Sequence, residues 1–333
     1  QSGDTTTIQV DLPQELLDVP NGEYELEISL NIENLQTPVI SDRVSISYYT
    51  KATYIEALQS INRNETALTL YFPDNNVNYL IPITRIIPYT RTPLRSTIDN
   101  LVSGPKKTLG LLNDSPVPTI QKLNLNRRIA NVYLPKDIGI YEEYSSSARI
   151  AVESFVNSLG SINEVDAVQF YFDNKIINDG FHGRVMNEPI YPSTTPKLYV
   201  GYITNTNRIL LTPISLDTDN ITIDDLFNGL KHSSNLLPYN YTLQPTVPEE
   251  VKLLNYNIED TNLQLKLNDA FITAYADNPD NRNLMIESIL YTLTSLKDIT
   301  SVEFQVEGFT TNVSEEILIN QPITPSPYIN PEQ

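Results

Sequence analysis

The sequence predicts an α+β protein: two tandem copies of one α/β sandwich domain, preceded by a β-rich N-terminal extension. Three observations predict it. The string Asn-x-Pro-Ile-x-Pro-Ser begins at Asn187 and returns at Asn320. Upstream landmarks such as Val168-Gln-Phe170 and Val302-Glu-Phe304 recur at nearly the same spacing, and strand and helix patterns follow the same order in both copies. The two strings begin 320 − 187 = 133 positions apart, and a repeat of that length is a domain rather than a solenoid unit.

The landmarks divide the chain into five expected segments. The extension is either a divergent half-copy of the repeat or a plain β-rich addition, because Ile8-Gln-Val-Asp-Leu-Pro13 echoes Ala130-Asn-Val-Tyr-Leu-Pro135. We expect the last segment to be loosely held. The segments are the extension over 1–66, a first domain over 67–177, a Pro/Gly linker over 178–196, a second domain over 197–320 and a Pro-rich tail over 321–333.

Composition limits the possible functions. The chain has 333 residues, of which 40% are hydrophobic, and this suffices for two ordinary cores. No apolar run approaches the roughly 18 residues of a transmembrane helix. The net charge of -19 repels phosphate backbones, so we expect no nucleic acid partner. The absence of cysteine excludes disulfides, thiolate catalysis and cysteine metal sites.

The first residues bear on where the protein is located. The chain begins with Gln1-Ser-Gly-Asp-Thr-Thr-Thr7, a polar leader without an initiator Met or a signal peptide, which indicates a mature or trimmed form. A lipoprotein that has lost its acylated cysteine would begin in this way. Further along the extension, Tyr24 to Ile32 and Arg43 to Tyr49 alternate between apolar and polar residues, which predicts two strands.

The first copy combines strands with two amphipathic helices. Pro82 favours an edge or a bulge in its strand. Thr92 is the candidate N-cap of the first helix, Pro93 suits the first turn and Gly104 ends it. Ser145-Ser-Ser147 opens and caps the second helix. The strands are expected at residues 68–72, 79–87, 129–134 and 165–172.

The second copy repeats this order. Thr222 caps its first helix, and the apolar residues from Ile286 to Leu296 form one face of its second helix. Each copy is therefore roughly β-β-α-β-α-β, with helices on one face of a small sheet. The strands are expected at residues 197–203, 208–214, 251–256, 263–267 and 302–306.

These segments resemble the GerMN domain over about residues 67–320. Two departures are Phe227-Asn-Gly229, which lacks the Pro that follows Gly in the domain's L-x-x-G-P turn, and the start before residue 67, which has no place in the pattern. The resemblance rests on Leu70-Tyr-Phe-Pro-Asp74, Leu80-Ile-Pro82, Arg85, Leu101-Val-Ser-Gly-Pro105, Val132 to Asp137, Val156-Asn-Ser-Leu159 and Val165 to Phe172, and in copy two on Leu198-Tyr199, Leu263 to Asp269, Tyr291 to Thr294 and Val302 to Gly308.

The tandem arrangement is similar to the sporulation and spore germination lipoproteins of endospore-forming Firmicutes. The resemblance implies small modules like the ring-building motifs, which pack side by side. It also implies a lipid-anchored, extracytoplasmic protein in the space between mother cell and forespore. There it would help to assemble the channel complex through contacts with envelope or sporulation channel proteins. No enzyme activity is implied.

The sequence indicates no catalytic chemistry. His182 and His232 lie in predicted loops and suggest no His-centred triad. Ser145 lacks a G-x-S-x-G context. The run from Asp217 departs from a calcium loop at Ile221 and Thr222, and Asp277-Asn-Pro-Asp280 suits a turn before a helix. We therefore assign no catalytic, cofactor-binding or metal-binding residue and expect no cofactor.

Three functions remain open. A structural envelope protein would use extended sheet edges or helix faces. A module that binds cell-wall glycan or peptide would need a cleft with aromatics and polar groups, and a hydrolase would need two carboxylates across a cleft. The 20 tyrosines offer an interaction surface, but Tyr71 and Tyr199 lie in predicted strands, where packing is the simpler role. We favour the structural protein, with peptidoglycan as the alternative partner.

Overall fold

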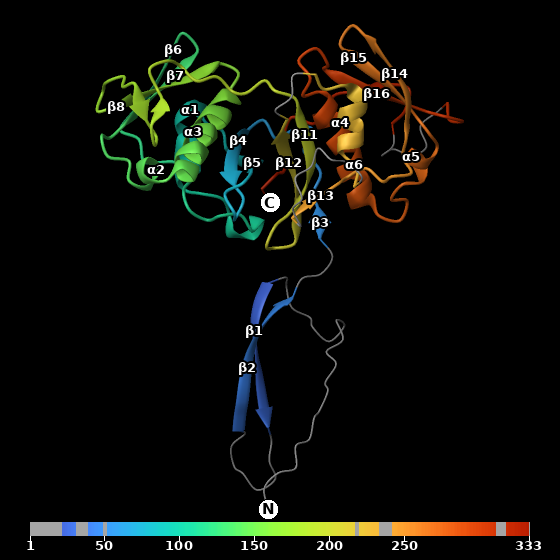
Figure 1. Ribbon diagram of the computed structural model, residues 1–333, viewed down its shortest axis with the longest axis horizontal. Helices are drawn as coiled ribbons and strands as arrows, with labels where there is room; N and C mark the ends of the chain where they lie inside the picture. The colour runs from blue at the N-terminus through green and yellow to red at the C-terminus, as the bar shows by residue number, and fades with distance from the viewer. Residues whose placement is uncertain are drawn as a thin grey trace, which may run out of the picture. The chain divides into compact units, whose positions relative to one another are not determined.

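The computed structural model describes residues 22–30, 39–48, 52–216, 220–232, 242–310 and 318–332. They divide into two units after Ala52. The first unit contains an antiparallel hairpin of β1 (Gly22–Leu30) and β2 (Val39–Tyr48), with a bulge after Ile28 (Figure 1). Both strands predicted from alternation are confirmed, although Ile32 and Tyr49, their expected last residues, lie outside the described ranges.

The first repeat builds two small sheets around two main helices. The hairpin β4–β5 forms one sheet, and β6, β7 and β8 form the other in that order. β7 and β8 are parallel because the chain crosses between them through α3. The elements are β4 (Glu65–Pro73), β5 (Leu80–Pro88), α1 (Pro93–Val102), η2 (Lys107–Leu109), β6 (Lys122–Asn126), β7 (Ile129–Leu134), α2 (Ile140–Glu143), α3 (Ser145–Gly160), β8 (Ala167–Phe172), β9 (Asp179–Gly180) and β10 (Arg184–Val185).

The second repeat has the same plan. β11 and β12 pair as β4 and β5 do, and α6 joins the parallel strands β15 and β16. The sheet order β14-β15-β16-β17 extends the pattern β6-β7-β8 by one short strand. The elements are β11 (Lys197–Ile203), β12 (Arg208–Ser215), α4 (Ile223–Gly229), β13 (Leu243–Gln244), β14 (Leu253–Glu259), β15 (Asn262–Leu267), α5 (Ala270–Thr273), α6 (Pro279–Leu293), β16 (Ser301–Val306) and β17 (Pro322–Ile323).

The duplication extends to individual hydrogen bonds. In the first repeat the backbone N–H of Tyr71 donates to the Ser158 hydroxyl of α3 at 2.9 Å. In the second, the N–H of Tyr199 donates to the Thr292 hydroxyl of α6 at the same distance. Both hydroxyls are fully buried, so in each repeat a shielded bond at the same position joins the main helix to the first strand.

The predicted helices and strands form, with differences at their ends. Thr222 caps α4 in a capping box, in which its hydroxyl accepts from the Asp225 N–H at 3.1 Å. Thr92 stands at the N-cap of α1, but its side chain makes no cap bond there, and Tyr144 rather than Ser145 precedes α3. The expected Ser cap is therefore wrong. β6 was not predicted, because only Leu123 and Leu125 alternate in so short a strand.

The repeated proline string has a structural role. In the first repeat Ile190, from that string, forms a bridge with Val168 of β8. In the second, Ile323 pairs with Val302 of β16 at the equivalent position. Each string thus returns the chain along the closing strand of its own repeat. Residues 178–196, expected as a linker, accordingly pack on the first repeat, where Phe181 and Met186 are completely buried.

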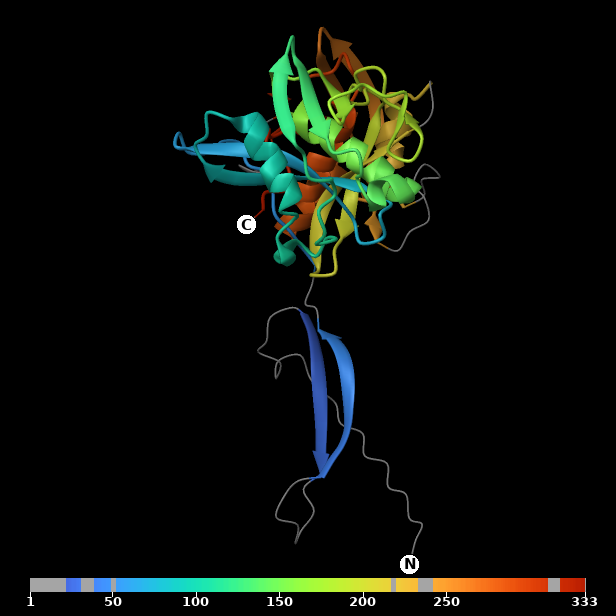
Figure 2. The ribbon, with the colours of Figure 1, turned by 90° about the vertical axis from the view of Figure 1, so that its left-hand side faces the viewer.

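Residues before and after the repeats pack against them. Thr53 and Tyr54 form β3, which adds to β12, so residues 53–66 join the second unit rather than the extension. The expectation of a loosely held tail is wrong: Asn330 is buried, and its side-chain N–H groups donate to the carbonyls of Pro82 on β5 and Leu211 on β12, each at 2.8 Å. The C-terminal end lies beside the β4–β5 hairpin in both views (Figure 1 and Figure 2).

Candidate functional site

The outer edge strand of each repeat carries two apolar side chains on the core-facing side of its sheet, and three of these four side chains are exposed. β14 lies at the edge of its sheet, and on it Tyr256 and Ile258 stand opposite the buried residues Leu265 and Leu263 of β15. They therefore project from the same face of the sheet as the core residues, yet Ile258 is 47% exposed and Tyr256 38% exposed. An apolar strip that continues the core into solvent is typical of an interaction surface.

The first repeat presents the same pair. Leu123 and Leu125 of β6 stand opposite the buried residues Val132 and Ala130 of β7, and Leu125 is 43% exposed. They occupy the positions of Tyr256 and Ile258 in the duplication. Here they line an open groove of about 760 Å³, together with the start of α1. We call Leu123/Leu125 and Tyr256/Ile258 the apolar edge pairs.

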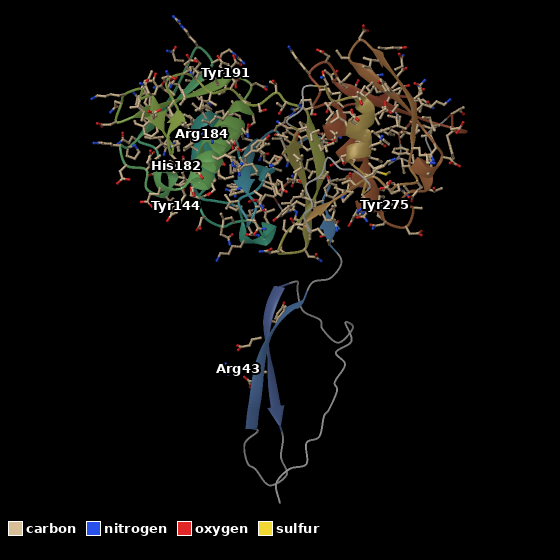
Figure 3. All side chains as sticks on the ribbon, in the orientation of Figure 1. Arg43, Tyr144, His182, Arg184, Tyr191 and Tyr275 are labelled. Atoms are coloured by element: carbon tan, nitrogen blue, oxygen red, sulfur yellow. The ribbon has the colours of Figure 1, made fainter. Side chains whose placement is uncertain are left out.

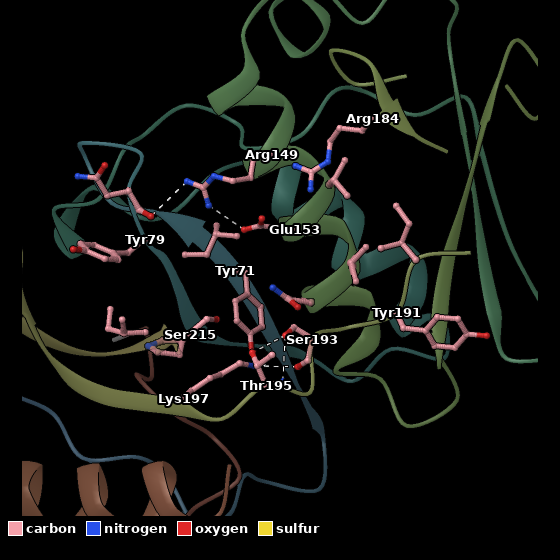
Figure 4. A pocket seen from close by; sticks show the side chains of 18 residues that line it. Tyr71, Tyr79, Arg149, Glu153, Arg184, Tyr191, Ser193, Thr195, Lys197 and Ser215 are labelled. Atoms are coloured by element: carbon pink, nitrogen blue, oxygen red, sulfur yellow. Dashed lines mark hydrogen bonds and ion pairs between the residues drawn. The ribbon is translucent and has the colours of Figure 1, made fainter. Parts of the chain in front are cut away.

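A second feature is a pocket of about 500 Å³ between the two repeats, which we call the inter-repeat pocket (Figure 4). Its walls come from β4, β5 and α3 of the first repeat, from the segment 190–195, and from β11 and β12 of the second. Tyr71 lies in the middle. Arg149 and Arg184 lie on one side and Lys197 on the other. The side chains of Val152 and Val156 give the pocket an apolar wall.

The cations of this pocket differ in their partners. Arg149 is engaged by the Glu153 carboxylate at 3.0 Å and by the Val77 carbonyl at 2.8 Å. Lys197 donates only a long bond of 3.4 Å to the Ser193 carbonyl, and burial lowers the pKa of its ammonium group. Within the described part of the chain, no carboxylate pairs with Lys197 or Arg184.

A third, smaller pocket of about 350 Å³ contains two carboxylates, Glu56 and Glu287. Burial raises the pKa of Glu287 to about 7, while hydrogen bonds from the Tyr54 hydroxyl and the Ala57 N–H act in the opposite direction. These bonds attach residues 53–57 to α6. The carboxylate of Glu287 therefore has a structural role.

The histidines lie apart and on the surface. The His182 ring faces the Glu142 carbonyl at 3.1 Å, and the residue is exposed in the first repeat (Figure 3). His232 is also exposed. Asp217 lies outside the described residues. Asp277 precedes Asn278, the N-cap of α6, as expected for a segment that leads into a helix. No group of three or more potential metal ligands occurs within the described ranges.

The strand tyrosines pack as expected. Burial raises the pKa of Tyr71 to about 12. The Tyr199 ring lies 5.3 Å from that of Tyr291. Sequence reasoning missed both the apolar edge pairs and the inter-repeat pocket. The strand predicted over 251–256 stops before Ile258, which belongs to β14 (Leu253–Glu259).

In the portion of the chain that the structure describes, no helix has the length and apolar character needed to cross a membrane.

Comparison with known proteins identifies the domain. The family model Germane, described as sporulation and spore germination, matches residues 69–178 and 204–311. The fold is similar to that of the tandem GerMN domains of the sporulation protein GerM from Bacillus subtilis, with a TM-score of 0.60, 17% identity, and coverage of 81% of this chain and 100% of that one.

The first GerMN domain of the same protein, as a separate structure, matches with a TM-score of 0.30 and 17% identity, over 40% of this chain and 96% of that one. A search of curated proteins gives no match. The family model covers more than half of the chain and matches it twice, in the two ranges where the structure repeats its fold. The chain is thus a tandem GerMN protein and belongs to the Germane family of sporulation and spore germination.

Proposed function

We propose that this chain is a non-enzymatic assembly protein of the bacterial cell envelope that acts in sporulation or germination by binding other proteins through its apolar edge pairs. The partners are envelope proteins of the channel complex that links mother cell and forespore. The protein works outside the cytoplasm, held to the cell membrane by a lipid anchor. Membership of the Germane family supports a role in sporulation or germination. The apolar edge pairs support binding to other proteins.

The observation that carries the proposal is the duplicated, uncovered edge. The outer side of β14 has no neighbouring strand among the described residues, so its outward N–H and C=O groups can pair with an added strand. Such a strand would also cover Tyr256 and Ile258, which now continue the core into solvent. Removal of this apolar surface from water would favour binding by a transfer free energy of roughly 25 cal/mol per Å² buried.

Two equivalent edges on one packed unit suit assembly. A partner with repeated subunits would bind both edges, and the second contact would then be intramolecular, which raises the overall affinity well above that of one edge. Catalysis is less well supported. Where the structure is described, neither His182 nor His232 contacts a carboxylate or a hydroxyl nucleophile, as a general base in such a site would.

Photo-crosslinking in sporulating cells tests the proposal. A benzophenone amino acid would replace Tyr256 in one variant and Leu125 in another. The matched control replaces Tyr144, which is 58% exposed but belongs to neither edge. We expect channel proteins among the crosslinked products at the two edge positions and not at Tyr144. Equal capture at all three positions, or no channel protein at either edge, would contradict the proposal.

A further inference from the structure

The inter-repeat pocket combines features that favour a particular class of ligand. It is concave, about 500 Å³ in volume, and is completed only when the two repeats pack together. Pockets of this size are large enough for a small organic molecule. We propose that it binds a short acidic glycan, in which carboxylates meet Lys197 and Arg184 while the sugar rings lie against Tyr71 and the wall of α3.

The charge of the pocket is opposite to that of the whole chain. The whole chain has a net charge of -19, yet this pocket contains three cations and one carboxylate. Glu153 is paired with Arg149, which leaves Lys197 and Arg184 without an acidic partner within the described residues. A half-buried lysine that lacks a carboxylate is costly unless something neutralises it, and an anionic ligand would do so.

The negative charge of the rest of the protein limits what that anion can be. A polyphosphate or a nucleic acid would extend beyond two cations into the repulsive field of the remaining surface. A ligand with one or a few carboxylates would not. The positions of the cations agree with this, because Lys197 and Arg184 lie on opposite sides of the pocket and can each meet a separate charge (Figure 4).

The remaining wall favours a sugar over a simple organic acid. Ser193, Thr195 and Ser215 supply hydroxyls, and Asn157 supplies an amide that can both donate and accept. Tyr71 and the side chains of Val152 and Val156 supply apolar area for the carbon face of a ring. Alternating polar and apolar contacts of this kind complement a carbohydrate, which has hydroxyls at its edge and C–H groups on its faces.

Isothermal titration calorimetry with the full chain tests this. The probe is digalacturonic acid, a disaccharide with one carboxylate on each ring; the corresponding digalactoside, which lacks both carboxylates, is its neutral counterpart. We expect the acidic disaccharide to bind more tightly than the neutral one. Lys197→Gln and Arg184→Gln should each weaken its binding about tenfold, as expected for loss of one charge-assisted hydrogen bond. The affinity for the neutral sugar should change little.

Matched controls are Lys136→Gln and Arg91→Gln, exposed residues outside the pocket that should bind like the unmodified chain. Arg184 is itself exposed, so its variant keeps the fold even if the Lys197 variant does not. Absence of binding, equal affinity for the two sugars, or equal losses in the control variants would overturn the proposal. None of these results affects the crosslinking experiment, because neither Leu125 nor Tyr256 lines this pocket.

Discussion

Glu332 and Arg85 form an ion pair in which the carboxylate is completely shielded from water and the guanidinium is 11% exposed. Arg85 lies on β5 of the first repeat, and Glu332 lies next to the last residue of the chain. A second oxygen of the same carboxylate accepts from Arg85 at 2.8 Å and from the Lys106 N–H at 2.9 Å. Together with Asn330, this pair holds the C-terminal residues between β5 and β12.

Glu332→Gln should destabilise the protein strongly. It removes the charge that compensates the buried Arg85, and breaking a buried pair in this way costs about 3–5 kcal/mol. Urea unfolding monitored by circular dichroism measures the loss. The control is Asp166→Asn, which breaks the exposed pair with Arg128 and should have a much smaller effect. Similar losses for the two variants would show that the Glu332 pair contributes little.

The duplicated hydrogen bonds to the Ser158 and Thr292 hydroxyls should contribute similar amounts to the free energy of unfolding. Ser158→Ala and Thr292→Val each leave a buried N–H, that of Tyr71 or Tyr199, without its acceptor. Each should lower the free energy of unfolding by about 1–3 kcal/mol. Thermal unfolding of both variants checks this, with the exposed Ser146→Ala in α3, the helix of Ser158, as control. A loss in only one repeat would contradict their equivalence.

Glu287 should make stability depend on pH. Its pKa rises from an ordinary value of 4.5 to about 7 because of burial, so the folded protein holds the proton more tightly than the unfolded chain. This stabilisation is complete below pH 4.5 and is lost as the pH rises through 7; it amounts to about 3 kcal/mol.

Glu287→Gln tests whether stability falls as the pH rises, because Gln keeps an acceptor for the Tyr54 hydroxyl but does not titrate. The melting temperature of the unmodified chain should fall between pH 5 and 7 relative to that of the variant. The exposed Glu188→Gln serves as control and should follow the unmodified chain. Parallel curves for the unmodified chain and the Glu287 variant would refute the raised pKa.

Gly160→Ala should destabilise the protein, although Ala usually stabilises a helix relative to Gly. In a helix Ala is ordinarily favoured over Gly by about 0.5–1 kcal/mol. Here an added Cβ would stand 2.5 Å from the ring of Pro192, in the first proline string. We expect a net loss of about 1–3 kcal/mol, as in other overpacked sites. Chemical denaturation measures it, and a stabilised variant would show that the string can move away.

The sequence by itself determined the duplication, the α+β class and most strands and helices. These follow from local patterns: alternation in β4 and β11, apolar spacing in α3 and α6, and the Thr222 capping box are visible within a few residues. The repeated string predicted a shared role, which the pairing of Ile190 and Ile323 with the closing strands supplies.

Only the tertiary structure decided which surfaces are covered and which polar groups meet. Asn330 contacts residues far away in sequence. Its neighbours along the chain give no sign that it is buried rather than exposed in a polar tail. Tyr256 and Ile258 alternate like core residues, yet both are exposed on the edge strand of their sheet. Lys197 and Arg184 line one pocket because two repeats pack together. Burial and pairing depend on long-range packing, whereas periodicity depends on neighbours along the chain.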